Sequence, residues 1–288
     1  MESLTEASAL LDRLHGVVRG CKIGSQLFTA AGPAAIELAR KRGFRVFLDL
    51  KFHDIPNTVA GAVREATRLG VFMLNVHASG GLGMMRAAAQ SVARAAQELG
   101  VPRPLCVAVT VLTSLGRRAL DVEVGVPATV EAQVLHLARL AQEAELDGCV
   151  ASPREAALLR QHLGKRWVIV TPGIRGTESR EAHGAASREW GGPESDVAPP
   201  RELRDPESDV APPRELGGPE SDVAPPRELG GPGGHVGAPR SNDDHSRIAT
   251  PAAALRAGAD FLVVGRPITA APDPAAAARA ILAECSAG

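Results

Sequence analysis

Residues 46–58 read VFLDLKFHDIPNT, and this stretch decides the fold that we predict. It begins as an apolar strand, in which side chains alternate between two faces, so Asp49 and Lys51 are expected on the same face. Asp54 follows three residues after Lys51, and Pro56 marks the end of the regular strand. In parallel α/β proteins, ligands bind at the carboxyl ends of the strands. The charges therefore indicate chemistry at a strand end, with a structural ion pair as the alternative.

Apolar strands and amphipathic helices alternate along the rest of the chain. We predict an α/β fold with a parallel sheet, in the form of a (β/α)8 TIM-type barrel. Because the chain begins with a helix, this barrel is expected to lack its first strand. An open doubly wound sheet is the alternative, but no Gly-rich dinucleotide loop follows an early strand. The seven expected strands lie near Lys22 (over 21–28), Asp49, Asn75, Val109, Val150, Val170 and Val264. The expected helices cover roughly 2–18, 34–42, 58–69, 82–99, 129–144, 154–163, 251–257 and 274–285.

A low-complexity insertion is expected at about residues 177–240. The sequence GGPESDVAPPREL at 191–203 recurs, slightly altered, at 204–216 and again at 217–229. Eleven of the chain's 22 prolines fall within 191–240, which argues against regular helix or sheet. We predict a disordered, Pro-rich insertion that interrupts a single domain spanning 1–288. A docking site for a partner is the alternative.

The bulk composition disfavours several classes of function. A net charge of -1 at pH 7 gives no electrostatic reason to expect nucleic acid or an anionic membrane surface as a partner. No apolar run approaches the roughly 20 residues of a membrane span, and no leader peptide is recognised. Four widely spaced cysteines lack metal-type pairing, and three of them lie in apolar segments, where we expect buried free thiols: Cys21, Cys106 and Cys149. A cytoplasmic location is the resulting expectation.

The run DLKFHDIPNT at 49–58 resembles the signature of the orotidine 5'-monophosphate decarboxylases, the last enzymes of UMP synthesis. Lys22, within CKIGSQLF, is similar to the first catalytic lysine of that family. The resemblance implies decarboxylation of orotidine 5'-monophosphate to UMP and CO2 with no cofactor and no metal. The catalytic residues are expected to be Lys22, Asp49, Lys51 and Asp54. Their charges alternate in sign, so each would be balanced by its neighbours when all four are buried.

The last two predicted strands end in glycine-arginine segments, at 173–175 and at Gly265-Arg266. Barrel enzymes often hold a phosphate on the loops after strands seven and eight, and arginine offers a forked, permanently charged partner. Two such segments at the two expected strand ends favour a phosphate site. The family resemblance agrees, and it implies substrate contacts for Arg266 and for the region near Thr171–Arg175. We assign Pro172, Arg175, Gly265 and Arg266 to substrate binding.

Three further segments match family positions, and two of these positions contact the substrate or the partner subunit. Thr113, within VTVLTS, matches a residue that hydrogen-bonds the pyrimidine, although a hydroxyl that closes a turn explains it equally well from spacing. Ile55 and Thr58, with Asp54, match residues that enter the partner's active site, so a homodimer with shared sites is expected. Asn75 and His77 match the family's Asn-Val-His strand end, and we interpret His77 as a supporting histidine. The eight histidines and the carboxylates show no ligand spacing for a metal beyond His53-Asp54.

The chain departs from the family pattern in two places. Family members begin with a strand that ends in Ala-Leu-Asp, whose aspartate contacts the ribose. We therefore expect that this chain is N-terminally incomplete, poorly soluble and weakly active. The family's phosphate loop usually carries a glutamine after paired acidic residues. Here Asp243-Asp244 lead to His245, which we assign to substrate binding.

Two other functions are considered. Metal-dependent sugar-phosphate lyases of the same superfamily also carry an Asp-x-Lys-x-x-Asp strand. They place a carboxylate ligand where this chain has Lys22, and they lack the Asp-Ile-Pro-Asn-Thr run. A decayed, non-catalytic barrel that acts as a binding module is the alternative from another class. The intact set of four charged residues argues against it.

Overall fold

The computed structural model describes residues 1–176 and 249–286, which lie within one compact unit, and the predicted insertion lies outside these residues. The strands are β1 Gly20–Gly24, β2 Arg45–Phe52, β3 Met73–His77, β4 Leu105–Val109, β5 Gly148–Val150, β6 Val168–Thr171 and β7 Phe261–Leu262. The helices are α1 Leu4–Leu14, α2 Ser25–Ala31, α3 Pro33–Lys41, α4 Pro56–Arg68, α5 Gly81–Leu99, α6 Val130–Glu143, α7 Ala156–Leu163, α9 Pro251–Arg256, α10 Arg266–Thr269 and α11 Pro274–Ser286. A 3-10 turn covers Ala78–Gly80 and a π-helical turn covers Ala119–Glu123.

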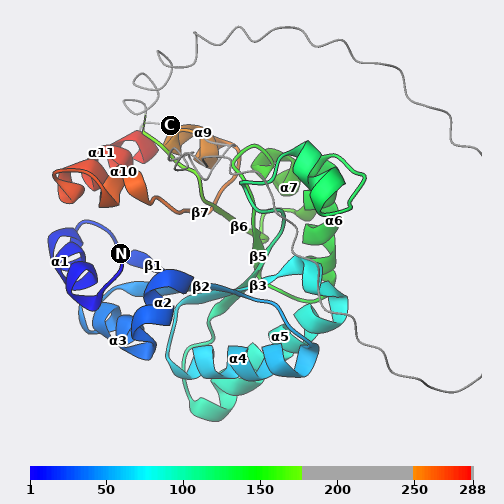
Figure 1. Ribbon diagram of the computed structural model, residues 1–288, viewed down its shortest axis with the longest axis horizontal. Helices are drawn as coiled ribbons and strands as arrows, with labels where there is room; N and C mark the ends of the chain where they lie inside the picture. The colour runs from blue at the N-terminus through cyan, green and yellow to red at the C-terminus, as the bar shows by residue number, and fades with distance from the viewer. Residues whose placement is uncertain (177–248, 287–288) are drawn as a thin grey trace, which may run out of the picture. The chain divides into compact units, whose positions relative to one another are not determined.

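The described strands form one parallel, seven-stranded sheet in which spatial order follows chain order from β1 to β7. Figure 1 shows the strands in the middle of this unit with the helices around them. An all-parallel sheet wound in one direction, with helices on its outer face, is the TIM-type α/β fold, so this prediction is confirmed. The sheet is curled but open, because no pairing within the described chain joins β7 to β1.

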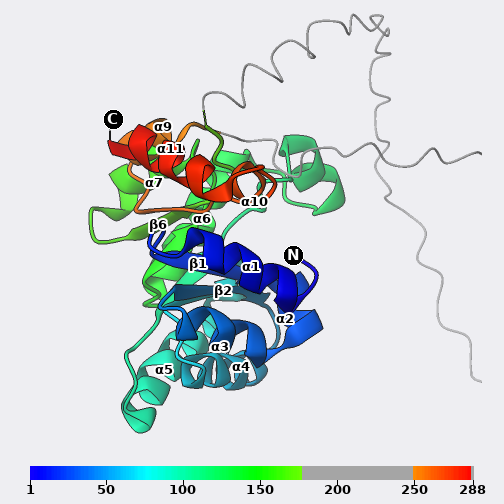
Figure 2. The same ribbon diagram turned by 90° about the vertical axis from the view of Figure 1, so that its left-hand side faces the viewer.

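The helical layer spans the open side of the sheet. Figure 2 shows α1, at the start of the chain, close to α10 and α11 near its end. The Arg13 guanidinium at the end of α1 donates to the Pro272 carbonyl at 2.8 Å and lies 3.8 Å from the Asp273 carboxylate. Helices from opposite ends of the chain therefore meet where β1 and β7 do not.

Two sets of apolar side chains cover the two faces of the sheet. The larger set lies between the sheet and the helices and includes Leu48 and Leu74. A smaller set lies on the inner face around Met73, and there the rings of Phe72 and Phe261 meet edge-on with centroids 5.9 Å apart. Because both faces are covered, a central strand such as β4 reads as a continuous apolar run, as expected for parallel sheets.

The strand predicted over residues 21–28 is wrong in its second half. Strand β1 ends at Gly24, and the helix α2 begins at Ser25. Leu27 and Ala31 are four residues apart, so they share one face of the helix, and both pack on the main core. A short segment that ends in two apolar residues, Leu27 and Phe28, fits a strand or a helix equally well, and here tertiary packing selects the helix.

Candidate active site

Strand β2 contains a bulge at the point where its charged residues begin. Leu48 pairs with Leu74 and Phe52 pairs with Val76, so β2 advances four residues while β3 advances two. Lys51 lies inside this bulge with a φ of 51°, a left-handed conformation that is uncommon for a residue other than glycine. Bulges near active sites re-aim side chains, and this one determines where Lys51 points.

The Asp49 carboxylate lies between two ammonium groups. Its Oδ1 is 2.7 Å from Lys51 Nζ, and its Oδ2 is 3.1 Å from Lys22 Nζ on the neighbouring strand β1. Gly24 leaves room for the Lys22 ammonium, because a Cβ at that position would lie 3.1 Å from Lys22 Nζ. Three of the four predicted catalytic residues therefore meet in one cluster, which we call the Asp49 cluster: Lys22, Asp49 and Lys51.

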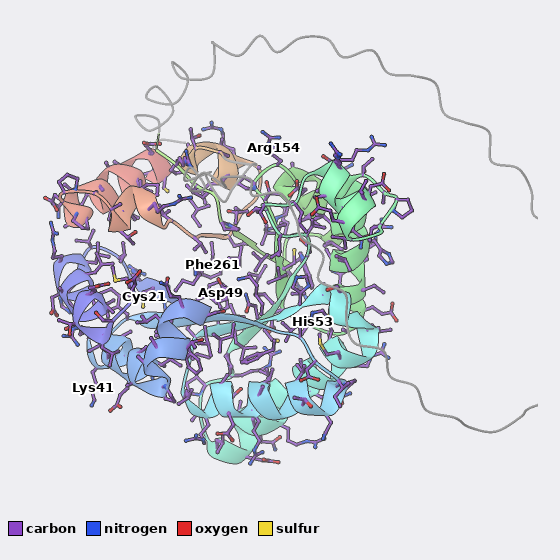
Figure 3. All side chains as sticks on the ribbon, in the orientation of Figure 1. Cys21, Lys41, Asp49, His53, Arg154 and Phe261 are labelled. Carbon is purple, nitrogen blue, oxygen red and sulfur yellow. The ribbon has the colours of Figure 1, made fainter. Side chains whose placement is uncertain are left out.

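Burial and charge oppose each other at Asp49. Its side chain is 12% exposed, whereas those of Lys22 and Lys51 are 36% and 37% exposed. Burial alone would raise the pKa of Asp49. The charge of Lys22 and the hydrogen bond and charge of Lys51 outweigh this effect and hold the pKa below its ordinary value. Asp49 is therefore an anion at neutral pH, flanked by two cations that water can reach. Figure 3 shows Asp49 amid the strands, and Lys41 on the outer helical layer.

Asn75 lies directly against the Asp49 cluster; the sequence places it in the Asn-Val-His strand end, but from the sequence we assign it no role at the site. It is fully buried in β3. Its Nδ2 donates to Asp49 Oδ1 at 2.6 Å, and its Oδ1 accepts from the Lys51 backbone N–H at 2.8 Å. One feature of the sequence points to such a role: Asn75 is a single amide within an apolar stretch. Because buried polar groups are nearly always hydrogen-bonded, a buried amide there requires polar partners.

Asp54 does not join the Asp49 cluster within one chain. It lies on the exposed segment between β2 and α4, where its Oδ1 accepts the backbone N–H of Ile55 at 2.6 Å. Among the described residues, no ion pair joins Asp54 to Lys22 or Lys51. Ile55 precedes the first turn of α4 and is 67% exposed, and Thr58 is exposed in that turn.

Two histidines lie beside the cluster. The rings of His53 and His77 stack with centroids 5.2 Å apart, and His77 Nδ1 is 2.7 Å from Ser79 Oγ. Burial lowers the pKa of His77, and the nearby His53 and Lys51 lower it further. A neutral His77 held by Ser79 agrees with its interpretation as a supporting residue.

The other predicted substrate-binding residues that the structure describes lie at the same carboxyl edge of the sheet. Thr113 follows β4 and is buried, whereas Gly265 and Arg266 follow β7 and are exposed. After β6, main-chain hydrogen bonds join two segments that are distant in sequence. Arg175 N donates to the Ala249 carbonyl at 3.1 Å, and Ala249 N donates to the Gly173 carbonyl at 3.3 Å. Pro172 is half-buried beside them, and His245 lies outside the described residues.

The described part of the chain contains neither a cluster of metal ligands nor a membrane span. Residues 1–176 and 249–286 contain no group of three or more His, Cys, Asp or Glu side chains placed to hold a metal ion. No helix among them is both long and apolar enough to span a bilayer. All four cysteines are free thiols. Cys106 and Cys149 are buried and Cys21 and Cys285 are half-buried, so the expectation of full burial is wrong for Cys21.

Comparisons with known proteins agree on one family. The model of the orotidine 5'-phosphate decarboxylase / HUMPS family matches residues 1–191 and 232–281. An orotidine 5'-phosphate decarboxylase from Moorella thermoacetica is 46% identical over 281 residues, which cover 98% of this chain and 87% of the relative. One from Nitrosococcus oceani is 41% identical, covering 98% of this chain and 92% of the relative. The crystal structure of orotidine 5'-phosphate decarboxylase from Lactobacillus acidophilus superposes with a TM-score of 0.69 at 28% identity, covering 99% of this chain and 95% of that one.

Proposed function

The chain belongs to the orotidine 5'-phosphate decarboxylase / HUMPS family, and we propose that it converts orotidine 5'-monophosphate to UMP and CO2 without a cofactor. The observation that carries this proposal is the mostly buried Asp49 carboxylate in contact with Lys22 and Lys51. An anion at this place repels a substrate carboxylate, and the surrounding cations stabilise the carbanion that forms when CO2 leaves. Both effects favour the transition state over the bound substrate.

The reaction then proceeds in two steps. The bond between C6 of the pyrimidine and its carboxylate breaks, CO2 leaves, and the electron pair stays on C6. The Lys51 ammonium stabilises this pair by its charge and then donates a proton to C6, which gives UMP. The resulting Lys51 amine takes a proton from water, while Lys22 keeps Asp49 ionised throughout.

Binding of the substrate's phosphate and base supplies the energy that places the substrate carboxylate next to Asp49. Arginine guanidinium groups bind phosphate through paired, charge-assisted hydrogen bonds, and glycine allows close approach of the backbone. Interactions with parts of the substrate that do not react can be used to force the carboxylate toward Asp49. The proposed phosphate ligands are Arg266, Gly265 and the loop near Arg175, and Thr113 is the proposed partner of the pyrimidine. Pro172 and His245 are proposed as further substrate-binding residues.

We include a homodimer with shared active sites in the proposal. Asp54, Ile55 and Thr58 are exposed and lie between β2 and the first turn of α4. A largely exposed isoleucine beside an exposed carboxylate suits contact with a second subunit better than contact with water. Asp54 would then complete the charge alternation of the partner's cluster. The free cysteines support a reducing, cytoplasmic location as part of the same proposal.

The test is release of labelled CO2 from carboxyl-labelled orotidine 5'-monophosphate, with UMP measured in the same samples. We expect equal amounts of both products, at a rate that EDTA does not change. The Lys51→Ala variant serves as the inactive control. Folded protein that releases no CO2 would refute the proposal. Turnover that EDTA abolishes and Mg²⁺ restores would contradict a reaction without a cofactor or metal.

A further inference from the structure

We propose that Asn75 is a positioning residue for the decarboxylation: its side-chain amide holds the Asp49 carboxylate and the Lys51 backbone in the geometry that the reaction requires. This inference rests on the proposed function. It assigns to Asn75 no contact with the substrate. The residue acts through the two side chains that do the chemistry.

The location of Asn75 requires an explanation. It is fully buried, and its neighbours in β3 are the buried apolar residues Met73, Leu74 and Val76. Alternation along the strand places Asn75 on the inner face with Met73, while Leu74 packs toward the helices. An amide in such surroundings destabilises the fold unless its polar atoms are hydrogen-bonded. Both of its polar atoms are hydrogen-bonded to β2.

The acceptor side of the amide stabilises the bulge. Between Leu48 and Phe52 the regular pairing of β2 with β3 is interrupted, so the backbone of β2 loses carbonyl partners there. Asn75 Oδ1 accepts a hydrogen bond from the Lys51 backbone N–H at 2.8 Å. It thereby replaces the backbone carbonyl of β3 that would accept this hydrogen bond in a regular sheet. The left-handed backbone of Lys51 persists because surrounding contacts of this kind hold it in place.

The donor side of the amide orients Asp49. Nδ2 donates at 2.6 Å to Oδ1, the same oxygen that Lys51 Nζ contacts at 2.7 Å. This arrangement leaves Oδ2 for Lys22. The orientation of the amide is unambiguous, because a backbone N–H can only donate and an ionised carboxylate can only accept. Asparagine satisfies both partners at once, whereas an ionised aspartate at position 75 could serve only Lys51.

Loss of this amide should therefore slow the chemistry with little effect on substrate binding. In Asn75→Ala, the Asp49 carboxylate loses one of its hydrogen bonds, and the backbone of Lys51 loses its acceptor. Misplacement of reacting groups by about 1 Å can reduce turnover by about 10²-fold. We expect a loss of about that size in kcat, with KM changed by less than about threefold, the pattern of an interaction made in the transition state.

The Asn75→Asp variant separates orientation from packing, because it keeps the shape of the side chain. Its carboxylate can still accept from Lys51 N–H, but it must be protonated to donate to Asp49. The titratable groups around it are Lys22 on β1, Asp49 and Lys51 on β2, and His77 on β3. The ratio of kcat for Asn75→Asp to kcat for wild type should therefore rise as the pH falls.

Thr110→Val is the matched control. Thr110 is buried just after the neighbouring strand β4, and its Oγ1 donates to the Val150 carbonyl at 2.9 Å, so the variant also removes one buried hydrogen bond. Its kcat should stay within about threefold of wild type. Circular dichroism and thermal unfolding of all variants establish which of them fold.

The outcomes distinguish this inference from the proposed function. Wild-type protein that does not decarboxylate orotidine 5'-monophosphate refutes the function. With active wild type, an unchanged kcat in folded Asn75→Ala refutes the positioning role. An equal loss in Thr110→Val refutes it too, and so does a pH-independent ratio for Asn75→Asp. If Asn75→Ala does not fold, the pH dependence of the isosteric Asn75→Asp variant decides the question.

Discussion

The β2–β3 end of the sheet and the β6–β7 end hold their polar residues in different ways. At β2–β3, Asp49 and Asn75 contact one another directly through side chains, and they come from consecutive strands of eight and five residues. At β6–β7 the strands have four and two residues, and the hydrogen bonds described after β6 join main-chain atoms of Gly173, Arg175 and Ala249. The comparison teaches that the charges proposed for the chemistry are preorganised by side-chain contacts, whereas main-chain hydrogen bonds join the segment after β6 that carries Arg175 to the segment at Ala249.

This difference matches the two tasks. Electrostatic catalysis needs groups that are already oriented before the substrate arrives, because reorganising them during the reaction raises the barrier. Binding of a phosphate needs charge and close approach, and long arginine side chains can adapt to it. Variants at the two ends should therefore affect different kinetic constants, and the predictions below test that division.

The largest effect is expected at the β2–β3 end. Lys51→Ala removes both the cation that stabilises the carbanion and the proposed proton donor. Each of these roles contributes at least about 10²-fold in enzymes, so kcat should fall by about 10³-fold or more. Steady-state rates and the melting temperature should be measured together. Lys41→Ala, which removes an exposed ammonium paired with Glu37 on α3, is the control and should leave both quantities near wild type. Retention of about a tenth of wild-type turnover by Lys51→Ala contradicts the assignment.

Mixing two inactive variants tests whether two active-site residues come from the same subunit or from different subunits. Lys51→Ala and Asp54→Ala should regain activity after subunit exchange, since one site in each mixed dimer carries neither change. Random exchange in a two-fold dimer predicts about a quarter of wild-type activity. Lys51→Ala mixed with Lys22→Ala is the control and should regain none, because these residues lie in the same cluster. No recovery in the first mixture, with exchange verified by mass spectrometry, argues against shared sites.

An intermediate effect is expected at the β6–β7 end. Arg266→Ala should lower kcat/KM by about 10- to 100-fold, because a hydrogen bond to a charged group is worth about 1.5–3 kcal/mol. With the nucleoside orotidine, which has no phosphate, the variant and the wild type should react at equal rates. Arg279→Ala on the exposed face of α11 is the matched control. If Arg266→Ala and the wild type differ as much on orotidine as on the nucleotide, Arg266 does not bind the phosphate.

The smallest effect concerns stability at low pH. The depressed pKa of Asp49 means that the folded state favours the carboxylate, so this contribution to stability is present above the unfolded pKa of about 4. It is lost as the pH falls through the lower, folded pKa. The difference in free energy of unfolding between wild type and Asp49→Asn should therefore shrink on acidification below about pH 4. Urea denaturation at a series of pH values measures it. A difference that does not change with pH would show that Lys22 and Lys51 contribute nothing to stability through Asp49.

The sequence predicted much of the fold because its signals are local. Apolar runs between amphipathic segments predicted the strands, and the glycines and prolines marked where many of the elements end. A clear exception is residues 25–28, in which Leu27 and Phe28 suit either element, and only packing against the core selects helix α2. The repeats and His245 lie outside the described residues, so what the sequence indicates about them stays a prediction.

By itself, the sequence determined which chemical groups are available and on which strands they lie: Asp49 and Lys51 on one strand and Lys22 on the strand before it. Only the tertiary structure decided which of them touch. Simple alternation does not continue through Lys51, because the bulge gives it a left-handed backbone, and Asn75 holds that backbone from the next strand. The physical reason is that parallel strands are joined through long connections, so contacts between their carboxyl ends depend on register and bulges that no local pattern encodes.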